Sequence, residues 1–149
     1  MPRQTPLQRE GKEQHLLDAA YKLFLGKGVL KTSIDEIVRE ADVAKGTFYL
    51  YFRNKEDLLQ KLVEKISTRI LSEAYHAMRQ HSSTDFAENV VTMVDYIVEY
   101  FKYNKLQLQL LERNFSWPMV RQAFSDQSDP LWKNLAQDLA QSPLAQRYT

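Results

Sequence analysis

The chain has 149 residues, a length that suits one domain or a small domain joined to a larger helical body. It contains only four glycines and five prolines, so local propensity favours helix almost throughout and we expect an all-α fold. The net charge of +1 does not single out a nucleic-acid binder, because affinity for phosphate depends on where the cations lie. Residues 1–55 hold ten Lys and Arg against seven Asp and Glu, a local excess of three positive charges.

Several classes of protein are disfavoured by what the sequence lacks. The absence of cysteine removes disulfides, thiolate metal sites and Cys nucleophiles, and it fits a reducing compartment. No apolar run approaches the roughly 18 residues of a membrane span, and residues 1–14 do not resemble a signal peptide, so we expect a soluble, cytoplasmic protein. His15, His76 and His81 lack metal-ligand spacing, and no phosphate-binding glycine loop or Ser/His/Asp arrangement is present. We therefore expect no enzyme, no metal site and no cofactor.

Two helices are predicted in the first part of the chain. The first begins near Glu13 and ends where Gly26 and Gly28 interrupt its pattern. Ser33-Ile-Asp-Glu has the spacing of a capping box, in which the first and last residues cap each other's backbone, and it predicts a second helix to about Ala41. The apolar face of the first helix consists of Leu16, Leu17, Ala20, Leu23 and Phe24.

A third, short helix is predicted to open at residues 44–47, after a turn of three or four residues that is typical of a helix-turn-helix. Asn54 and Asp57 then have the spacing of a helix N-cap. The helix that they start is expected to run for about 25 residues, or roughly 38 Å, so it could couple two ends of a molecule. Its apolar stripe consists of Leu58, Leu59, Leu62, Ile66, Ile70, Leu71 and Ala74.

The second half alternates polar breaks with apolar helical patterns. After the polar residues 81–85, such patterns predict helices over residues 86–101 and 106–115. Pro118 indicates the start of a short helix. A last helix is predicted over residues 129–141, because it begins with Asp-Pro, a cap followed by proline. The all-α expectation thus extends over the whole chain.

Residues 32–55, with the sequence TSIDEIVREADVAKGTFYLYFRNK, resemble the DNA-binding domain of the TetR (tetracycline repressor) family. The Thr-Ser cap, Lys-Gly-Thr, two tyrosines and the Phe-Arg-Asn-Lys run fall at the family's spacing, and the resemblance covers about residues 10–62. Val38 stands where the family usually has alanine, and Asp42 where it usually has glycine, but aspartate tolerates the left-handed backbone of such a turn. The residues expected to pack the helices together are Ile37, Ala41, Val43, Phe48 and Phe52.

The resemblance implies a three-helix helix-turn-helix DNA-binding domain over residues 1–54, joined by the long helix to a helical regulatory domain over residues 55–149. It implies a transcriptional regulator, a repressor, that binds a roughly palindromic double-stranded DNA operator as a homodimer and has no membrane partner. The family dimerises through two long C-terminal helices. Because the chain stops at Thr149, after only the beginning of what could be the first, we expect its C-terminal part to be incomplete.

Nine residues are candidate DNA contacts. Gly46 lacks a side chain where the backbone must approach phosphates or bases closely. Lys45 and Thr47 can reach phosphates or base edges, and Leu50 could touch a thymine methyl. Lys55 begins the long helix, where a phosphate would also meet free N–H groups. Helix capping and solvated lysines are the plain alternatives. The full set is Thr32, Ser33, Lys45, Gly46, Thr47, Tyr49, Leu50, Tyr51 and Lys55.

The regulatory region suggests a pocket for a small apolar effector, because aromatic and methionine side chains are unusually frequent there. The alternative is an ordinary helical core. For the whole chain, the alternative function is a helical adaptor that binds protein and uses the helix-turn-helix as a packing unit. The sequence names neither the effector nor the operator. The candidate pocket residues are Met93, Tyr96, Tyr100, Phe115, Trp117 and Phe124.

Overall fold

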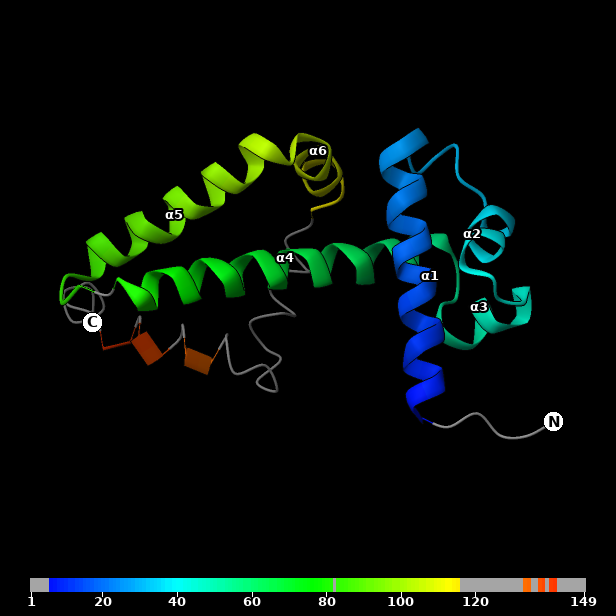
Figure 1. The fold of residues 1–149 in the computed structure, drawn as a ribbon, viewed down its shortest axis with the longest axis horizontal. Coiled ribbons are helices and arrows are strands. Elements are labelled where there is room, and N and C mark those ends of the chain that lie inside the picture. The colour runs from blue at the N-terminus through cyan, green and yellow to red at the C-terminus, as the bar shows by residue number, and fades with distance from the viewer. Residues whose placement is uncertain (1–5, 82, 116–132, 135–136, 139, 142–149) are drawn as a thin grey trace. The chain divides into compact units, whose positions relative to one another are not determined.

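The computed structural model describes residues 6–81, 83–115, 133–134, 137–138 and 140–141. Within these residues the fold consists of helices joined by short turns, which confirms the all-α expectation (Figure 1). None of the described helices combines the length and apolar character needed to cross a membrane. The helices are α1 (Pro6–Lys27), α2 (Ile34–Ala41), α3 (Lys45–Tyr51), α4 (Lys55–Gln80), α5 (Phe86–Tyr103) and α6 (Lys105–Asn114).

The chain divides into two compact units, Met1–Val63 and Glu64–Thr149. The division falls inside α4, which contributes residues 55–63 to the first unit and residues 64–80 to the second. The domain boundary predicted from the sequence, between residues 54 and 55, lies at the start of α4 and stays a prediction.

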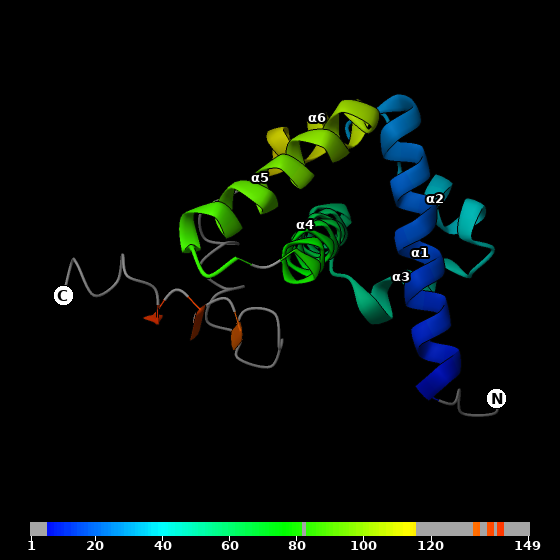
Figure 2. The ribbon, with the colours of Figure 1, turned by 60° about the vertical axis from the view of Figure 1, so that its left-hand side comes forward.

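In the first unit, α1, α2 and α3 lie against one another (Figures 1 and 2). α1 begins at Pro6, seven residues before the predicted start at Glu13; proline is tolerated in the first turn of a helix. It continues past Gly26 and ends at Lys27, where Gly28 adopts a φ of 89° and its N–H donates to the Phe24 carbonyl (2.9 Å). The buried core of this unit includes Leu16, Leu17, Ala20, Phe24, Ile37, Phe48, Phe52, Leu58, Leu62 and Val63.

In the second unit, α4 buries one face, and the predicted helices α5 and α6 are both present. Asp85 caps α5, since its Oδ1 accepts from the Ala87 N–H (2.9 Å), but no residue of α5 is buried. α6 buries Gln107, Leu110 and Leu111. The helix predicted near Pro118 lies outside the described residues. Of the last predicted helix, residues 133–134, 137–138 and 140 are described and are helical.

Candidate nucleic-acid interface

Hydrogen bonds fix both ends of α2. Ser33 Oγ accepts from the Glu36 backbone N–H (3.2 Å), and Glu36 Oε2 accepts from the Ser33 backbone N–H (2.8 Å), so the predicted capping box is present. At the other end, Asp42 is left-handed (φ 56°, ψ 47°) and its N–H donates to the Arg39 carbonyl (3.2 Å). The turn into α3 therefore closes with aspartate in the left-handed position, as expected.

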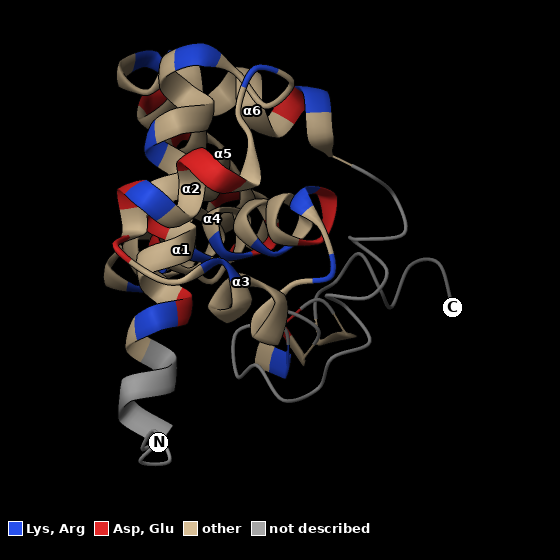
Figure 3. Ribbon diagram, turned by 90° about the vertical axis from the view of Figure 1, so that its right-hand side faces the viewer, with Lys and Arg blue, Asp and Glu red and all other residues tan. Residues whose placement is uncertain are grey.

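α3 buries one face and exposes the other. Phe48 is fully buried and its ring centroid lies 5.6 Å from that of Phe52, which is also buried. Outside this buried face, Leu50 is 75% exposed and Tyr49 is 52% exposed. Figure 3 shows positive and negative residues interleaved over α1 and α2, whereas α3 is mainly uncharged. The scaffold prediction is confirmed for Phe48 and Phe52, and α3 has an outward face available for a partner.

Gly46 lies in the first turn of α3 on the surface of the unit. A Cβ built at this position would meet no heavy atom within 4 Å, and the backbone does not have a positive φ. Neither packing nor backbone conformation therefore requires glycine here, although glycine costs about 0.5–1 kcal/mol in a helix relative to alanine. The surface at Gly46 is therefore open to a partner that approaches α3 from outside the domain.

Lys55 ties the first turn of α4 to the loop between α1 and α2. Its Nζ donates to the carbonyls of Val29 (2.8 Å) and Thr32 (2.9 Å). Thr32 is 2% exposed, and its Oγ1 donates to the Gly28 carbonyl (2.8 Å), which closes the same loop. Two of the three N–H groups of the ammonium are used in these bonds. Sequence reasoning missed this clamp, because loop carbonyls leave no residue pattern to read.

The other polar candidates differ in accessibility. Ser33 is exposed and its side chain caps α2, while Thr47 is partly exposed near the start of α3. The hydroxyl of Tyr51 is buried and has no hydrogen-bond partner within the described residues. A buried hydroxyl without a partner costs about 1–3 kcal/mol, and this one must become accessible before it can meet a phosphate.

Among the described residues, three ion pairs connect α2 to the helices beside it. All are largely at the surface, where such pairs contribute about 0–1 kcal/mol each. One of them involves Lys45, a candidate DNA contact, and the hydrogen bond from Lys45 to the Asp35 carboxylate raises the pKa of the lysine. Asp35 was not singled out in the sequence. The pairs are Lys45–Asp35 (2.8 Å), Lys22–Glu40 and Lys27–Glu36.

Glu36 takes part in both the capping box and the ion pair with Lys27. The hydrogen bond from Lys27, followed by that from the Ser33 backbone, lowers the pKa of the Glu36 carboxyl to about 2. The carboxyl is thus ionised over the whole physiological range. Ionised glutamate in the first turn of a helix is also favoured by the helix dipole.

The two tyrosines of the candidate effector pocket make polar contacts in the second unit. Tyr96 donates its hydroxyl to Glu73 Oε2 (2.9 Å), and this hydrogen bond raises the pKa of Tyr96. Arg69 Nη2 donates to the Tyr100 hydroxyl (3.1 Å), which in turn donates to Oε1 of Gln107, a residue only 3% exposed. The aromatic pattern did not predict this network, because it reports ring size and not the partners of the hydroxyls.

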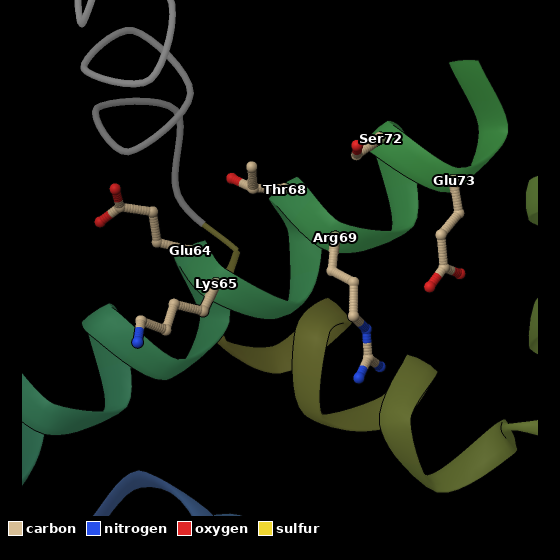
Figure 4. A pocket seen from close by; sticks show the side chains of 6 residues that line it. All are labelled: Glu64, Lys65, Thr68, Arg69, Ser72 and Glu73. Carbon is tan, nitrogen blue, oxygen red and sulfur yellow. The ribbon is translucent and has the colours of Figure 1, made fainter. Parts of the chain in front are cut away.

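A cavity of ≈ 420 Å³ lies along α4 in the same unit. Figure 4 shows Glu64, Thr68 and Ser72 on one side of the helix and Lys65, Arg69 and Glu73 on another. Of the remaining predicted pocket residues, Met93 is partly exposed, Phe115 is 56% exposed, and Trp117 and Phe124 lie outside the described residues. The apolar pocket therefore stays a prediction. The cavity is lined by Glu64, Lys65, Thr68, Arg69, Ser72 and Glu73.

Comparison with known proteins identifies the helix-turn-helix. Residues 16–62 match the family described as "Bacterial regulatory proteins, tetR family", and this range contains α2, the turn and α3. The chain belongs to the TetR family through its N-terminal domain. YvdT of Bacillus subtilis, an HTH-type transcriptional regulator, is 37% identical over 95 residues, which cover 64% of this chain and 46% of YvdT. TetR-family membership thus rests on the unit that carries the candidate DNA contacts.

Solved structures of TetR-family regulators resemble more of the chain. A regulator from Shewanella sp. PV-4 has 28% identity and a TM-score of 0.59, over 87% of this chain and 69% of its own. One from Marinobacter aquaeolei VT8 has a TM-score of 0.68 over 92% of this chain and 71% of its own; at 17% identity it supports the fold alone. The chain spans about a third to a half of the length of the curated relatives it matches first, with shares of 46%, 34% and 53%.

Proposed function

We propose that the protein is a transcriptional repressor in which α3 enters the major groove of a double-stranded DNA operator. In this proposal Lys45, Thr47 and Leu50 meet phosphates and base edges, and Tyr49 meets phosphate. The family resemblance implies further contacts to the phosphate backbone of DNA, made by Thr32, Ser33, Tyr51 and Lys55. The role is binding, with no catalytic step.

The observation that supports the proposal most is Gly46. Its position is open in the free domain, and glycine weakens the helix that contains it. A surface that must receive a phosphate backbone closely explains both facts, since a methyl group there would hold the partner away. The exposed Leu50 beside it fits the same surface, because a large apolar side chain in the open suits contact with a thymine methyl.

The salt dependence of DNA binding tests this proposal against the adaptor alternative. The full 149-residue chain is titrated onto a fluorescent random-sequence duplex at several salt concentrations, and the slope of log affinity against log salt is measured. A DNA-binding protein gives a slope of about −0.9 for each phosphate neutralised, whereas an adaptor gives little affinity and little slope. Selection from a random duplex pool then identifies the operator, which we expect to be roughly palindromic.

We further propose that a small effector binds beside α4 near Tyr96 and Tyr100 and tilts this helix. In the homodimer, such a tilt would change the separation of the two α3 helices and so lower operator affinity. Linkage then requires operator to lower effector affinity by the same factor, typically about 5 to 150-fold. Calorimetric titration of a candidate effector with and without operator tests the coupling, and equal affinities in the two titrations would exclude it.

A further inference from the structure

Lys45 is the first residue of α3 and its charge is already engaged in the free domain. Its Nζ lies 2.8 Å from Oδ1 of Asp35, the second residue of α2, with the two side chains 55% and 62% exposed. Lys45 is also the only lysine or arginine within α3, whose sequence is KGTFYLY. The cation that the helix can offer to DNA is therefore paired with a carboxylate on the neighbouring helix.

The pair adds little to stability, because solvent screens the attraction between exposed charges. It can affect DNA binding in two ways. The Asp35 carboxylate repels phosphates that approach Lys45, and this repulsion acts on every DNA sequence. It also orders the flexible lysine stem before DNA arrives, so that less side-chain freedom is lost on binding. Because an ammonium has three N–H donors, Lys45 can keep Asp35 and still donate to DNA.

These two effects act differently on different DNA sequences. Repulsion weakens binding to all duplexes, and nonspecific complexes depend on phosphate contacts for nearly all of their affinity. Ordering helps only where an acceptor on the operator lies within reach of Lys45 as Asp35 holds it. We propose that Asp35 is a specificity-determining residue, which orients Lys45 for the operator and suppresses binding to other DNA. This inference rests on the proposed DNA-binding function.

The test compares Asp35→Asn with Glu40→Gln in the full chain. Both changes remove one negative charge from α2, but Glu40 pairs with Lys22 of α1 and does not touch Lys45. Affinities are measured for a duplex selected from a random pool by the wild-type chain and for a shuffled duplex, over a range of salt. Asp35→Asn is expected to raise affinity for the shuffled duplex severalfold, to steepen its salt slope by up to about 1, and to reduce the ratio of selected to shuffled affinity at least about threefold.

Three results would overturn the inference. If Glu40→Gln lowers the ratio as much as Asp35→Asn, the effect is one of net charge. If Asp35→Asn changes both affinities equally, Asp35 has no part in specificity. In a Lys45→Ala background the effect of Asp35→Asn on the ratio should vanish, and its persistence would show that Lys45 does not carry it. Absence of salt-dependent binding by the wild-type chain would instead remove the proposed function together with the inference.

Discussion

α2, in the first unit, and α5, in the second, differ in how far their residues are buried. α2 has only eight residues, yet three of them are buried and both of its ends are capped. α5 has eighteen residues and a strongly apolar sequence, yet none of them is buried, and Val91, Val94 and Val98 are each at least half exposed. A short helix with buried residues and capped ends is thus held in place by more contacts than a long apolar helix with no buried residue. Helical stability comes mainly from tertiary packing, and apolar content alone does not supply it.

The sharpest test of this contrast compares a core phenylalanine with an exposed valine. Phe48→Ala is expected to destabilise the first unit by about 3–5 kcal/mol, because Phe48 is fully buried and truncation leaves a cavity. Val94→Ala should change stability by less than about 0.5 kcal/mol, since Val94 is 50% exposed. Urea unfolding followed by circular dichroism measures both, and similar losses would mean that α5 is packed as tightly as α3.

The second prediction concerns the lysine clamp of the first unit. Lys55→Ala removes the donor from two loop carbonyls, so it should cost about 1–3 kcal/mol of stability. If Lys55 also meets a phosphate, the substitution weakens binding to all DNA sequences about equally and lowers the magnitude of the salt slope by about 1. Lys61→Ala is the matched control, since Lys61 is exposed on the same helix.

The two roles of Lys55 separate in these measurements. A loss of stability with an unchanged salt slope would leave the loop clamp and remove the phosphate contact. The reverse result would mean that the loop carbonyls find water when the ammonium is absent. Equal behaviour of the Lys55 and Lys61 variants in both assays would contradict both roles.

The sequence predicted the parts of the fold that local chemistry determines. The capping box of α2, the left-handed turn at Asp42 and the Asn54 cap of α4, whose Oδ1 accepts from the Asp57 N–H (2.8 Å), are set by neighbouring residues and were all expected. The start of α1 was placed too late, at Glu13, because residues before it lack an apolar stripe although they form helix. In this chain, capping residues therefore predict the ends of helices more reliably than apolar periodicity does.

The sequence predicted the helices of the candidate site, but it did not predict which groups the charged side chains contact. Exposure of Leu50 and burial of Phe48 follow from their spacing on one short helix. The engagement of Lys45 by Asp35, and of Lys55 by two loop carbonyls, depends on where long side chains reach across the fold. Such contacts join residues that no local pattern connects, so only the three-dimensional structure reveals them.

A third prediction contrasts two glycines of the first unit. Both Gly46 and Gly26 lie within helices, and an added Cβ would meet no atom within 4 Å at either position. Alanine should therefore stabilise the unit by up to about 1 kcal/mol in both cases. Only Gly46→Ala should weaken operator binding, by about tenfold or 1.4 kcal/mol, because its methyl group would lie against the DNA backbone. Full operator affinity in this variant would mean that the α3 backbone does not approach DNA closely.

The smallest expected effect is the pH dependence of the capping box. The pKa of Glu36 is lowered to about 2 from an ordinary value of 4.5, so folding favours its ionised form. Its contribution to stability is fully present above about pH 4.5 and is lost as the pH falls towards 2.

Glu36→Gln can still accept from the Ser33 N–H but loses the charge that pairs with Lys27. The variant is therefore expected to be slightly less stable at pH 7 and to lose less stability between pH 4.5 and 2. Urea unfolding at several pH values measures the difference, with Glu40→Gln as the control that removes another α2 ion pair and keeps the capping box. If the wild type and Glu36→Gln have parallel stability curves below pH 4.5, the Lys27 pair is not maintained in solution and the capping box acts through its neutral hydrogen bonds alone.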